Sequence, residues 1–283
     1  MNDDTSPHPE LRHACNWREC IVFSLLLLFP LLGGASLLLG IKIHHQRRKT
    51  AEQRRVIDDI EASGGRVWTH FGGHPYSWLR RNLVEDSVLM VDLSGTGFTE
   101  FSDLRQLKGL MNLNLDGTEI EDLSPLADLT RLQNLFLSNT RVSDLTAISA
   151  LPGLRSLDVS GTLVRDIAAL SGKQLEELSL ARTDIRDLSP LAGMELSKLI
   201  LSGMQQVNMT SLPASLRVKR LNISDTGIKD VTPLLGLYYL DEVDLTNTPV
   251  VPSEIDRLKE KMPSCKIITS ASREQAPSDG VRE

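Results

Sequence analysis

The sequence predicts an α/β solenoid of about eight stacked coils, preceded by a transmembrane helix. Apolar positions return at intervals of 21 or 22 residues between Val88 and Val251, and a fixed period of this length indicates a stacked array. Within each unit, apolar residues first alternate and then recur at a spacing of three, which favours a short strand followed by a tight turn. The helix is predicted by residues 21–41, which carry no charge.

The amino-terminal region divides into a polar tail and an apolar span. Residues 1–20 contain two prolines and few apolar residues, so we expect a disordered tail. Residues 21–41, IVFSLLLLFPLLGGASLLLGI, would form a helix about 31 Å long. Because the hydrocarbon core of a bilayer is roughly 30 Å thick, this span is predicted to cross the lipid bilayer.

Two alternatives concern the apolar span. A cleaved signal peptide would use Gly33 to Ala35 as its small-residue site, although the apolar run continues beyond that site to Ile41. Ser36 and Gly40 form one small-residue pair, which leaves homo-association through the span as an alternative.

Residues 42–55 form a basic juxtamembrane stem. They contain six lysines and arginines, whereas only Arg12 and Arg18 precede the span. The excess of positive charge after the span favours a cytoplasmic repeat region. The alternative is a basic stem that lies on anionic headgroups on either side of the membrane, so an extracytoplasmic repeat region stays open.

Residues 56–87 are expected to cap the open end of the array. Residues 50–63 have apolar positions at helical spacing and are followed by two glycines, and a short strand is predicted from Arg66 to His70. Four aromatic residues precede the first unit, and a shielding cap explains them better than a ligand-binding cluster. These are Trp68, Phe71, Tyr76 and Trp78. His70 and His74 lack cysteine or acidic partners at metal-binding spacing, so no metal site is predicted.

The unit from Leu110 to Arg131, LMNLNLDGTEIEDLSPLADLTR, shows the pattern most clearly. Alternation turns Leu113 and Leu115 inward and leaves Asn112 and Asn114 on the outer side of the strand. The later DLSPL segment suits a single 3-10 turn, which its aspartate caps and its proline begins. One such unit buries too few side chains to be stable alone, so stacked neighbours must share a core.

The repeated LxxLxLxxTxIxDLSPLxxL pattern resembles the 22-residue leucine-rich repeat and is most similar to the internalin-like bacterial type. The resemblance covers residues 88–268. It implies a horseshoe with short parallel strands on the concave face and 3-10 or irregular turns on the convex face. Threonine stands where the family often has a buried asparagine, which predicts hydroxyl bonds along the rod and a looser turn. These residues are Thr96, Thr118, Thr140, Thr162, Thr183, Thr226 and Thr248.

The repeats, residues 88–251, contain one irregular unit and end in a second cap. The unit LSKLILSGMQQVNMTSLPASLR has lost the threonine and the Asp-Leu turn, so we expect a local bulge there. Residues 252–269 are predicted to form a carboxy-terminal cap, with a helix from about Ser253 and a strand at 265–269, followed by a disordered tail, residues 270–283. Cys15, Cys20 and Cys265 are too few for a disulfide framework and are expected to be reduced or isolated.

The chemistry expected of the chain is limited. A net charge of −6 without a basic stripe argues against nucleic-acid binding. No motif for a cofactor, a metal or a nucleophile is present, so we expect neither catalysis nor a cofactor. Five aspartates recur once per unit, and helix capping explains them better than calcium binding. These are Asp122, Asp144, Asp166, Asp187 and Asp230.

The outer side of the strands is left as the candidate functional surface. An exposed Phe136 among polar neighbours, and a basic spot beside Ile200, have the composition of a protein interface. The predicted partner-binding residues are Asn112, Asn114, Asn134, Phe136, Asp158, Glu177, Lys198, Ile200, Arg220 and Asn222. The hypothesis is a membrane-anchored, non-catalytic module that binds a protein partner on the concave face. The alternative is a structural scaffold or self-associating spacer without a specific ligand.

Overall fold

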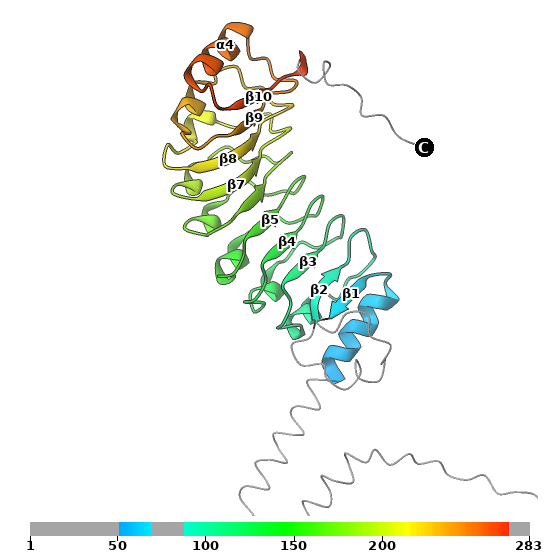
Figure 1. The fold of residues 1–283 in the computed structure, drawn as a ribbon. Helices are drawn as coiled ribbons and strands as arrows, with labels where there is room; N and C mark the ends of the chain where they lie inside the picture. The colour runs from blue at the N-terminus through cyan, green and yellow to red at the C-terminus, as the bar shows by residue number, and fades with distance from the viewer. Residues whose placement is uncertain (1–50, 70–87, 272–283) are drawn as a thin grey trace, which may run out of the picture. The chain divides into compact units, whose positions relative to one another are not determined.

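The computed structural model describes residues 51–69 and 88–271, which belong to the second of two units of the chain, residues 51–283. Its ten strands form one continuous sheet, in which β1 pairs with β2 antiparallel and all later neighbours pair in parallel (Figure 1). The strands are β1 (Arg66–Thr69), β2 (Val88–Asp92), β3 (Asn112–Asn114), β4 (Asn134–Phe136), β5 (Ser156–Asp158), β6 (Glu177–Ser179), β7 (Glu195–Ile200), β8 (Arg217–Asn222), β9 (Glu242–Asp244) and β10 (Lys266–Ile268). The predicted solenoid of parallel strands is confirmed.

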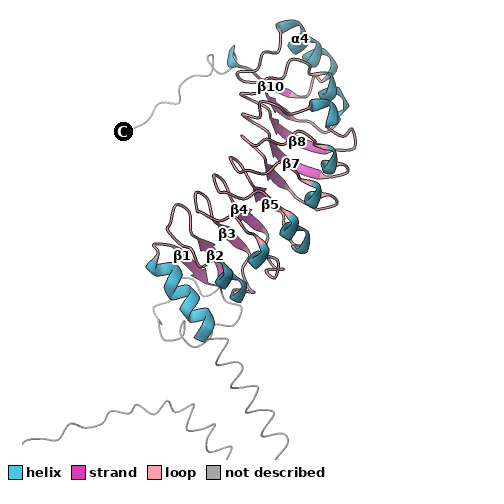
Figure 2. Cartoon of the chain, turned by 180° about the vertical axis from the view of Figure 1, so that it is seen from behind, coloured by secondary structure: helices cyan, strands magenta, loops and turns pink. Residues whose placement is uncertain are grey.

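Short 3-10 helices follow the strands and line one side of the stack of coils, as Figures 1 and 2 both show. They are η1 (Phe101–Gln106), η2 (Ser124–Leu126), η3 (Thr146–Ala150), η4 (Ala168–Leu170), η5 (Ser189–Leu191), η6 (Met209–Ser211) and η7 (Thr232–Gly236). The predicted 3-10 turns are therefore confirmed. Pro125 occupies one of the first two positions of η2, where a missing N–H costs nothing.

Both ends of the described repeats carry the helices and strands that the sequence predicts. Residues 51–62 form a helix that ends before Gly64, whose φ is +89°. Val56 and Ile60 of this helix belong to the same buried cluster as the repeat leucines. At the other end, α4 (Pro252–Lys261) is followed by β10, and Cys265 between them is a buried free thiol.

The core is one continuous column of aliphatic side chains. Each strand turns its central residue inward, and Leu113, Leu135 and Leu178 are at most 1% exposed. Because strand positions alternate between two faces, this burial places the flanking residues of each strand on the outside. The predicted inward direction of these leucines is confirmed.

Each coil turns sharply three residues after the end of its strand, through a residue with a left-handed backbone. This residue is glycine in several coils, but Asn139, Arg182, Asp225 and Asn247 hold φ between 54° and 57° there. Its backbone N–H donates to a carbonyl of the next coil, for example from Asn139 to Ser160 at 2.8 Å. The backbone ladder between coils therefore extends beyond the strands.

The repeated threonines hold this turn from inside their own coil. The Thr118 hydroxyl donates to the Leu115 carbonyl at 2.7 Å, and Thr140 bonds Leu137 at the same distance. The prediction that a hydroxyl bonds a nearby backbone group is confirmed, but the predicted ladder along the rod is wrong. The hydroxyl reaches only the carbonyl three residues earlier, and backbone N–H groups link the coils instead.

The aspartate of each Asp-Leu turn caps the 3-10 helix that follows it. Asp122 accepts the Ser124 N–H at 2.8 Å, and Asp187 accepts the Ser189 N–H at the same distance. Hydrogen bonds from the side chain and backbone of the residue two positions on lower the pKa of Asp122, Asp144 and Asp230; the same bonds, the backbone one first, lower the pKa of Asp187. The predicted capping role is therefore confirmed.

We expect these caps to make the fold sensitive to acid. A carboxyl whose pKa is lower in the folded chain than its unfolded value of about 3.9 stabilises the fold above that value. This stabilisation is lost as the pH falls through the folded pKa. Asp116 has the opposite effect, because burial raises its pKa. The stability that protonated Asp116 contributes is lost as the pH rises through its folded pKa.

The measurement is the melting temperature between pH 2 and pH 6, for the wild type and for a variant with Asp122→Asn, Asp144→Asn, Asp187→Asn and Asp230→Asn. Asparagine keeps the cap, since Asn208 accepts the Thr210 N–H at 3.0 Å in its own coil. Below pH 4, the melting temperature of the variant should fall less than that of the wild type. If the melting temperatures of the two proteins fell equally with pH, the four aspartates would not be the source of the acid sensitivity.

The irregular unit, residues 196–217, keeps the sheet in register. Leu196 pairs with Val218 and Ile200 with Asn222, at the constant offset of 22 residues that regular units have. In the altered turn that follows β7, Met204 fills the vacated core position with 0% exposure and Asn208 replaces the capping aspartate; the bulge expected at this turn stays a prediction. The register irregularity among the described strands lies instead between Trp68 and Thr69 of β1.

Several predictions concern residues that the structure does not describe. The tail 1–20, the span 21–41, residues 42–50 of the stem, the cap residues 70–87 and the carboxy-terminal residues 272–283 lie outside the described residues. Within residues 51–69 and 88–271, no helix has the length and apolar character needed to cross a membrane.

Candidate functional site

The outward side chains of β2–β9 form the surface that we call the strand face. Each strand contributes its first and third residue of the segment that pairs with the next coil, as the registers of Asn112 with Asn134 and of Asn114 with Phe136 illustrate. All ten residues predicted to bind a partner lie on this face, on β3–β8. Their side chains differ in how many of their hydrogen-bond donors and acceptors already have a partner.

The amino-terminal half of the strand face is uncharged in its first column. Asn112, Asn134 and Ser156 are register neighbours on β3, β4 and β5, and all three are half-buried. The Asn134 amide donates to the Asn112 carbonyl oxygen. These two amides therefore form one polar strip across two strands.

In the second column, polar side chains hold the turn that follows the strand. Asn114, Asp158 and Asn222 each accept the backbone N–H two residues later, at 2.8 to 2.9 Å. Their oxygens are therefore engaged in Asx turns. The amide nitrogens of Asn114 and Asn222 are left to donate.

Phe136 is less exposed than the sequence suggested. It lies between Asn114 and Asp158 in the register of neighbouring strands, and it is half-buried. Because adjacent strands are only about 4.8 Å apart, a ring on one strand is flanked by the side chains of the next. The prediction of an exposed ring is corrected to a ring with one accessible part.

The carboxy-terminal half of the strand face is charged. Glu177, Lys198, Arg220 and Glu242 are successive register neighbours on β6–β9. The Glu242 carboxylate pairs with Lys266 at 2.9 Å, whereas Lys198 and Arg220 form no ion pair or hydrogen bond through their side chains in the described part of the chain. The structure brings together the predicted basic spot.

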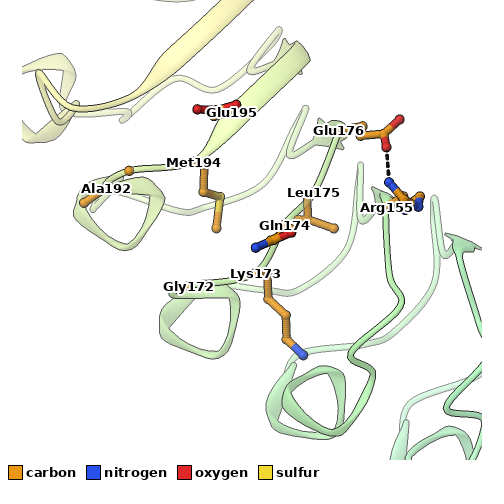
Figure 3. Close-up of a pocket in the computed structure, with 10 residues that line it drawn as sticks. Arg155, Gly172, Lys173, Gln174, Leu175, Glu176, Ala192, Met194 and Glu195 are labelled. Atoms are coloured by element: carbon orange, nitrogen blue, oxygen red, sulfur yellow. Dashed lines mark hydrogen bonds and ion pairs between the residues drawn. The ribbon is translucent and has the colours of Figure 1, made fainter.

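A depression of about 490 Å³ lies beside the strand face, at the edge where the chain enters β6 and β7 (Figure 3). It follows from two successive units of 21 residues, which lack one residue between the 3-10 helix and the next strand. In the first of them Lys173 replaces a buried leucine, and its ammonium donates to the Ser149 and Leu151 carbonyls at 2.7 and 3.0 Å. On the rim, Arg155 pairs with Glu176.

Two tyrosines on the same edge were not singled out from the sequence. Tyr238 is 88% exposed. The guanidinium carbon of Arg217 lies over the ring of Tyr239, 5.1 Å from the ring centroid. Arg217 also pairs with Glu195 at 2.6 Å. The sequence could have identified these two tyrosines, because they occupy the two positions before Leu240, where most other units have polar residues or glycine.

The described residues contain no cluster of three or more metal-ligating side chains. Four acidic side chains of the strand face, Asp92, Asp158, Glu242 and Asp244, bond to backbone N–H groups or basic side chains. What this arrangement offers is a broad surface of donors, acceptors and a few apolar side chains.

The comparisons with known proteins agree with this architecture. The family model described as Leucine Rich repeats (2 copies) matches residues 130–172. Internalin C2 of Listeria monocytogenes is 30% identical, with a TM-score of 0.58; the match covers 65% of this chain and 80% of that one. The comparison with curated proteins gave no significant match.

Two further solved structures are matched at lower similarity. Internalin F of Listeria monocytogenes is 20% identical with a TM-score of 0.40, over 64% of this chain and 66% of that one. The plant peptide hormone receptor RGFR1, solved in complex with RGF2, is 18% identical with a TM-score of 0.40, over 59% of this chain and 29% of that one. The repeat period, the parallel sheet and the likeness to internalin C2 together place the chain among the leucine-rich-repeat proteins, with internalins among its structural neighbours.

Proposed function

We propose that the chain is a non-catalytic module that binds a protein partner on the strand face. Leucine-rich-repeat proteins generally act in protein–protein binding, and folds of this kind typically serve as non-enzymatic scaffolds. The observation that carries the proposal is the continuous register of β2–β9, which sets two outward columns of side chains side by side without interruption.

The dimensions of the strand face suit a protein rather than a small molecule. Eight strands at about 4.8 Å spacing extend over roughly 34 Å, which is enough to bury the approximately 800 Å² per partner of a stable interface. Phe136 on β4 and Ile200 on β7 are separated by three strand intervals. They supply two apolar contacts within a surface of amides and charges, the mixture that interfaces show.

We also propose that residues 21–41 anchor the chain in a bilayer as a single-pass helix. The support is the uncharged sequence itself, together with the basic residues at 42–55. The positive charge after the span favours the cytoplasmic side for the repeats. Protease treatment of sealed vesicles tests this, since repeats on the cytoplasmic side of the membrane stay intact in right-side-out vesicles, and digestion there would contradict the orientation.

The proposed binding surface is tested with a triple variant, Phe136→Ala, Ile200→Ala and Arg220→Ala. We expect it to lose the proteins that co-purify with the full-length wild type from its native membranes, because it removes the apolar contacts and one charge from the strand face. A control variant, Leu163→Ala, Val251→Ala and Arg131→Ala, removes comparable exposed groups elsewhere and should retain them. Both variants should unfold at the wild-type temperature.

Unchanged recovery of every partner by the triple variant would contradict strand-face recognition. If the wild type, the triple variant and the control variant all recover only further copies of the chain, the alternative of a self-associating scaffold is supported. The two functions are thus separated by what co-purifies and by which variant loses it.

A further inference from the structure

Two cations on the strand face stand next to each other with no counter-ion among the described residues. Lys198 on β7 and Arg220 on β8 are register partners in the parallel sheet. Like charges directly opposite one another on neighbouring strands destabilise a sheet. Their position therefore calls for a reason other than the stability of the fold.

Several other cations of the described repeats pair with a carboxylate of a neighbouring coil. Arg141 contacts Glu119 at 2.6 Å, and Arg217 contacts Glu195 at 2.6 Å. Lys198 and Arg220 each have a glutamate on the adjacent outer strand, but Lys198 forms no ion pair with Glu177. Glu242, the neighbour of Arg220, is bonded to Lys266 instead.

The remaining outward positions of β7 and β8 add donors and an apolar group but no free acceptor. The Asn222 oxygen accepts the Ser224 N–H at 2.9 Å, so the Asn222 amide nitrogen is the part left to bond a ligand. Ile200 is half-buried beside it in the register. We call Lys198, Ile200, Arg220 and Asn222 the donor patch.

We propose that the donor patch binds an acidic segment of the protein partner, with aspartate or glutamate carboxylates accepting from Lys198, Arg220 and Asn222. This rests on the proposed function and names the chemistry of the partner at one part of the strand face. Arginine binds carboxylates through two parallel bonds, and Ile200 contacts the aliphatic part of the segment.

The surroundings of the donor patch restrict what it accepts. Glu177 and Glu242 flank it on β6 and β9, and the chain as a whole has a net charge of −6. An extended polyanion such as a nucleic acid would meet these carboxylates on both sides. A narrow acidic segment that crosses two strands satisfies the donors without reaching the flanking glutamates.

The test uses fluorescein-labelled octaglutamate as the probe and the full-length chain in a non-ionic detergent. We expect fluorescence anisotropy to show binding that weakens as sodium chloride rises from 50 to 300 mM, because the contact is electrostatic. Lys198→Glu with Arg220→Glu should weaken binding at least tenfold. Arg131→Glu with Lys229→Glu makes the same change in net charge at exposed cations away from the strand face, and should leave affinity within twofold.

The single variant Lys198→Gln separates binding from folding. It removes the like charge opposite Arg220 without adding a carboxylate beside Glu177, so the melting temperature should stay the same or rise while octaglutamate binding falls. Equal affinity of the two double variants, or no binding by the wild type at millimolar peptide, would overturn the proposal. So would tighter binding of oligothymidylate that depends on the same two residues. None of these outcomes changes whether the strand-face alanine variant loses its co-purifying partner, so the proposed function is judged independently.

Discussion

Replacing Leu135 with alanine is expected to lower the free energy of unfolding by about 3 kcal/mol, the usual cost of emptying a leucine site in a packed core. Leu135 lies at the centre of β4 with 0% exposure, and the leucines of the coils before and after contact the same core. The surrounding coils are held by backbone ladders on both sides and collapse poorly into the space. Urea unfolding followed by circular dichroism measures the loss.

The matched control is Leu163→Ala, the same chemical change at a side chain that is 62% exposed. Its effect should stay within about 0.5 kcal/mol, as for most surface substitutions. The contrast between the two leucines tests whether the central residue of β4 points into the core. Equal losses would mean that Leu135 is not buried there.

Gly203→Ala is the second change with a large expected effect, a loss of about 2 kcal/mol that combines two causes. Gly203 has a φ of +73°, where an alanine costs about 1 kcal/mol in backbone strain. The added Cβ would also lie 2.8 Å from the Cγ of Arg182 in the preceding coil. Forcing such a contact apart costs roughly another 1 kcal/mol. Chemical denaturation of the full chain gives the total.

Two comparisons separate these causes. Gly117→Ala has a similar φ of +68° but meets only backbone atoms at 3.9 Å, so it should show the strain alone, about 1 kcal/mol. In an Arg182→Gly background the Cγ is gone, and Gly203→Ala should cost no more than Gly117→Ala does. A coupling energy near zero between positions 182 and 203 would contradict the predicted contact.

The fold could be derived from the sequence because the signal is repeated in every unit. A single alternation at Leu113 and Leu115 is ambiguous, but its return at a nearly constant interval fixes both the strand direction and the parallel register. The same parity placed all ten candidate residues on the outer face. The basic spot at Lys198 and Arg220 was also predictable, since two positions 22 residues apart in 22-residue units become neighbours.

What the sequence could not provide depends on distances between coils. Whether the Thr118 hydroxyl bonds within its coil or across to the next is decided by which carbonyl lies within about 3 Å. The partial burial of Phe136 depends on the side chains of β3 and β5 beside it. Within the described residues, the absence of a counter-ion at Arg220 depends on Glu242 bonding Lys266 instead, a choice among several rotamers that spacing does not determine.

The depression beside β6 also shows how far the repeat pattern can be followed. Two intervals of 21 residues were evident in the sequence, but the depression that they leave at the edge of the sheet was not. A missing residue removes a leucine from the edge of the core, and Lys173 takes its place by bonding the carbonyls of the preceding coil. Burial lowers the pKa of this lysine, which agrees with its position inside the edge.

Hydroxyl-radical footprinting of the complex that co-purifies from native membranes tests strand-face recognition most directly. If the partner lies on the strand face, Phe136 and Ile200 should lose reactivity in the complex, whereas Tyr238, Tyr239 and Leu163 should react as in the free chain. Protection of the two tyrosines with Phe136 and Ile200 unchanged would show that the partner binds the neighbouring edge, and would contradict the account.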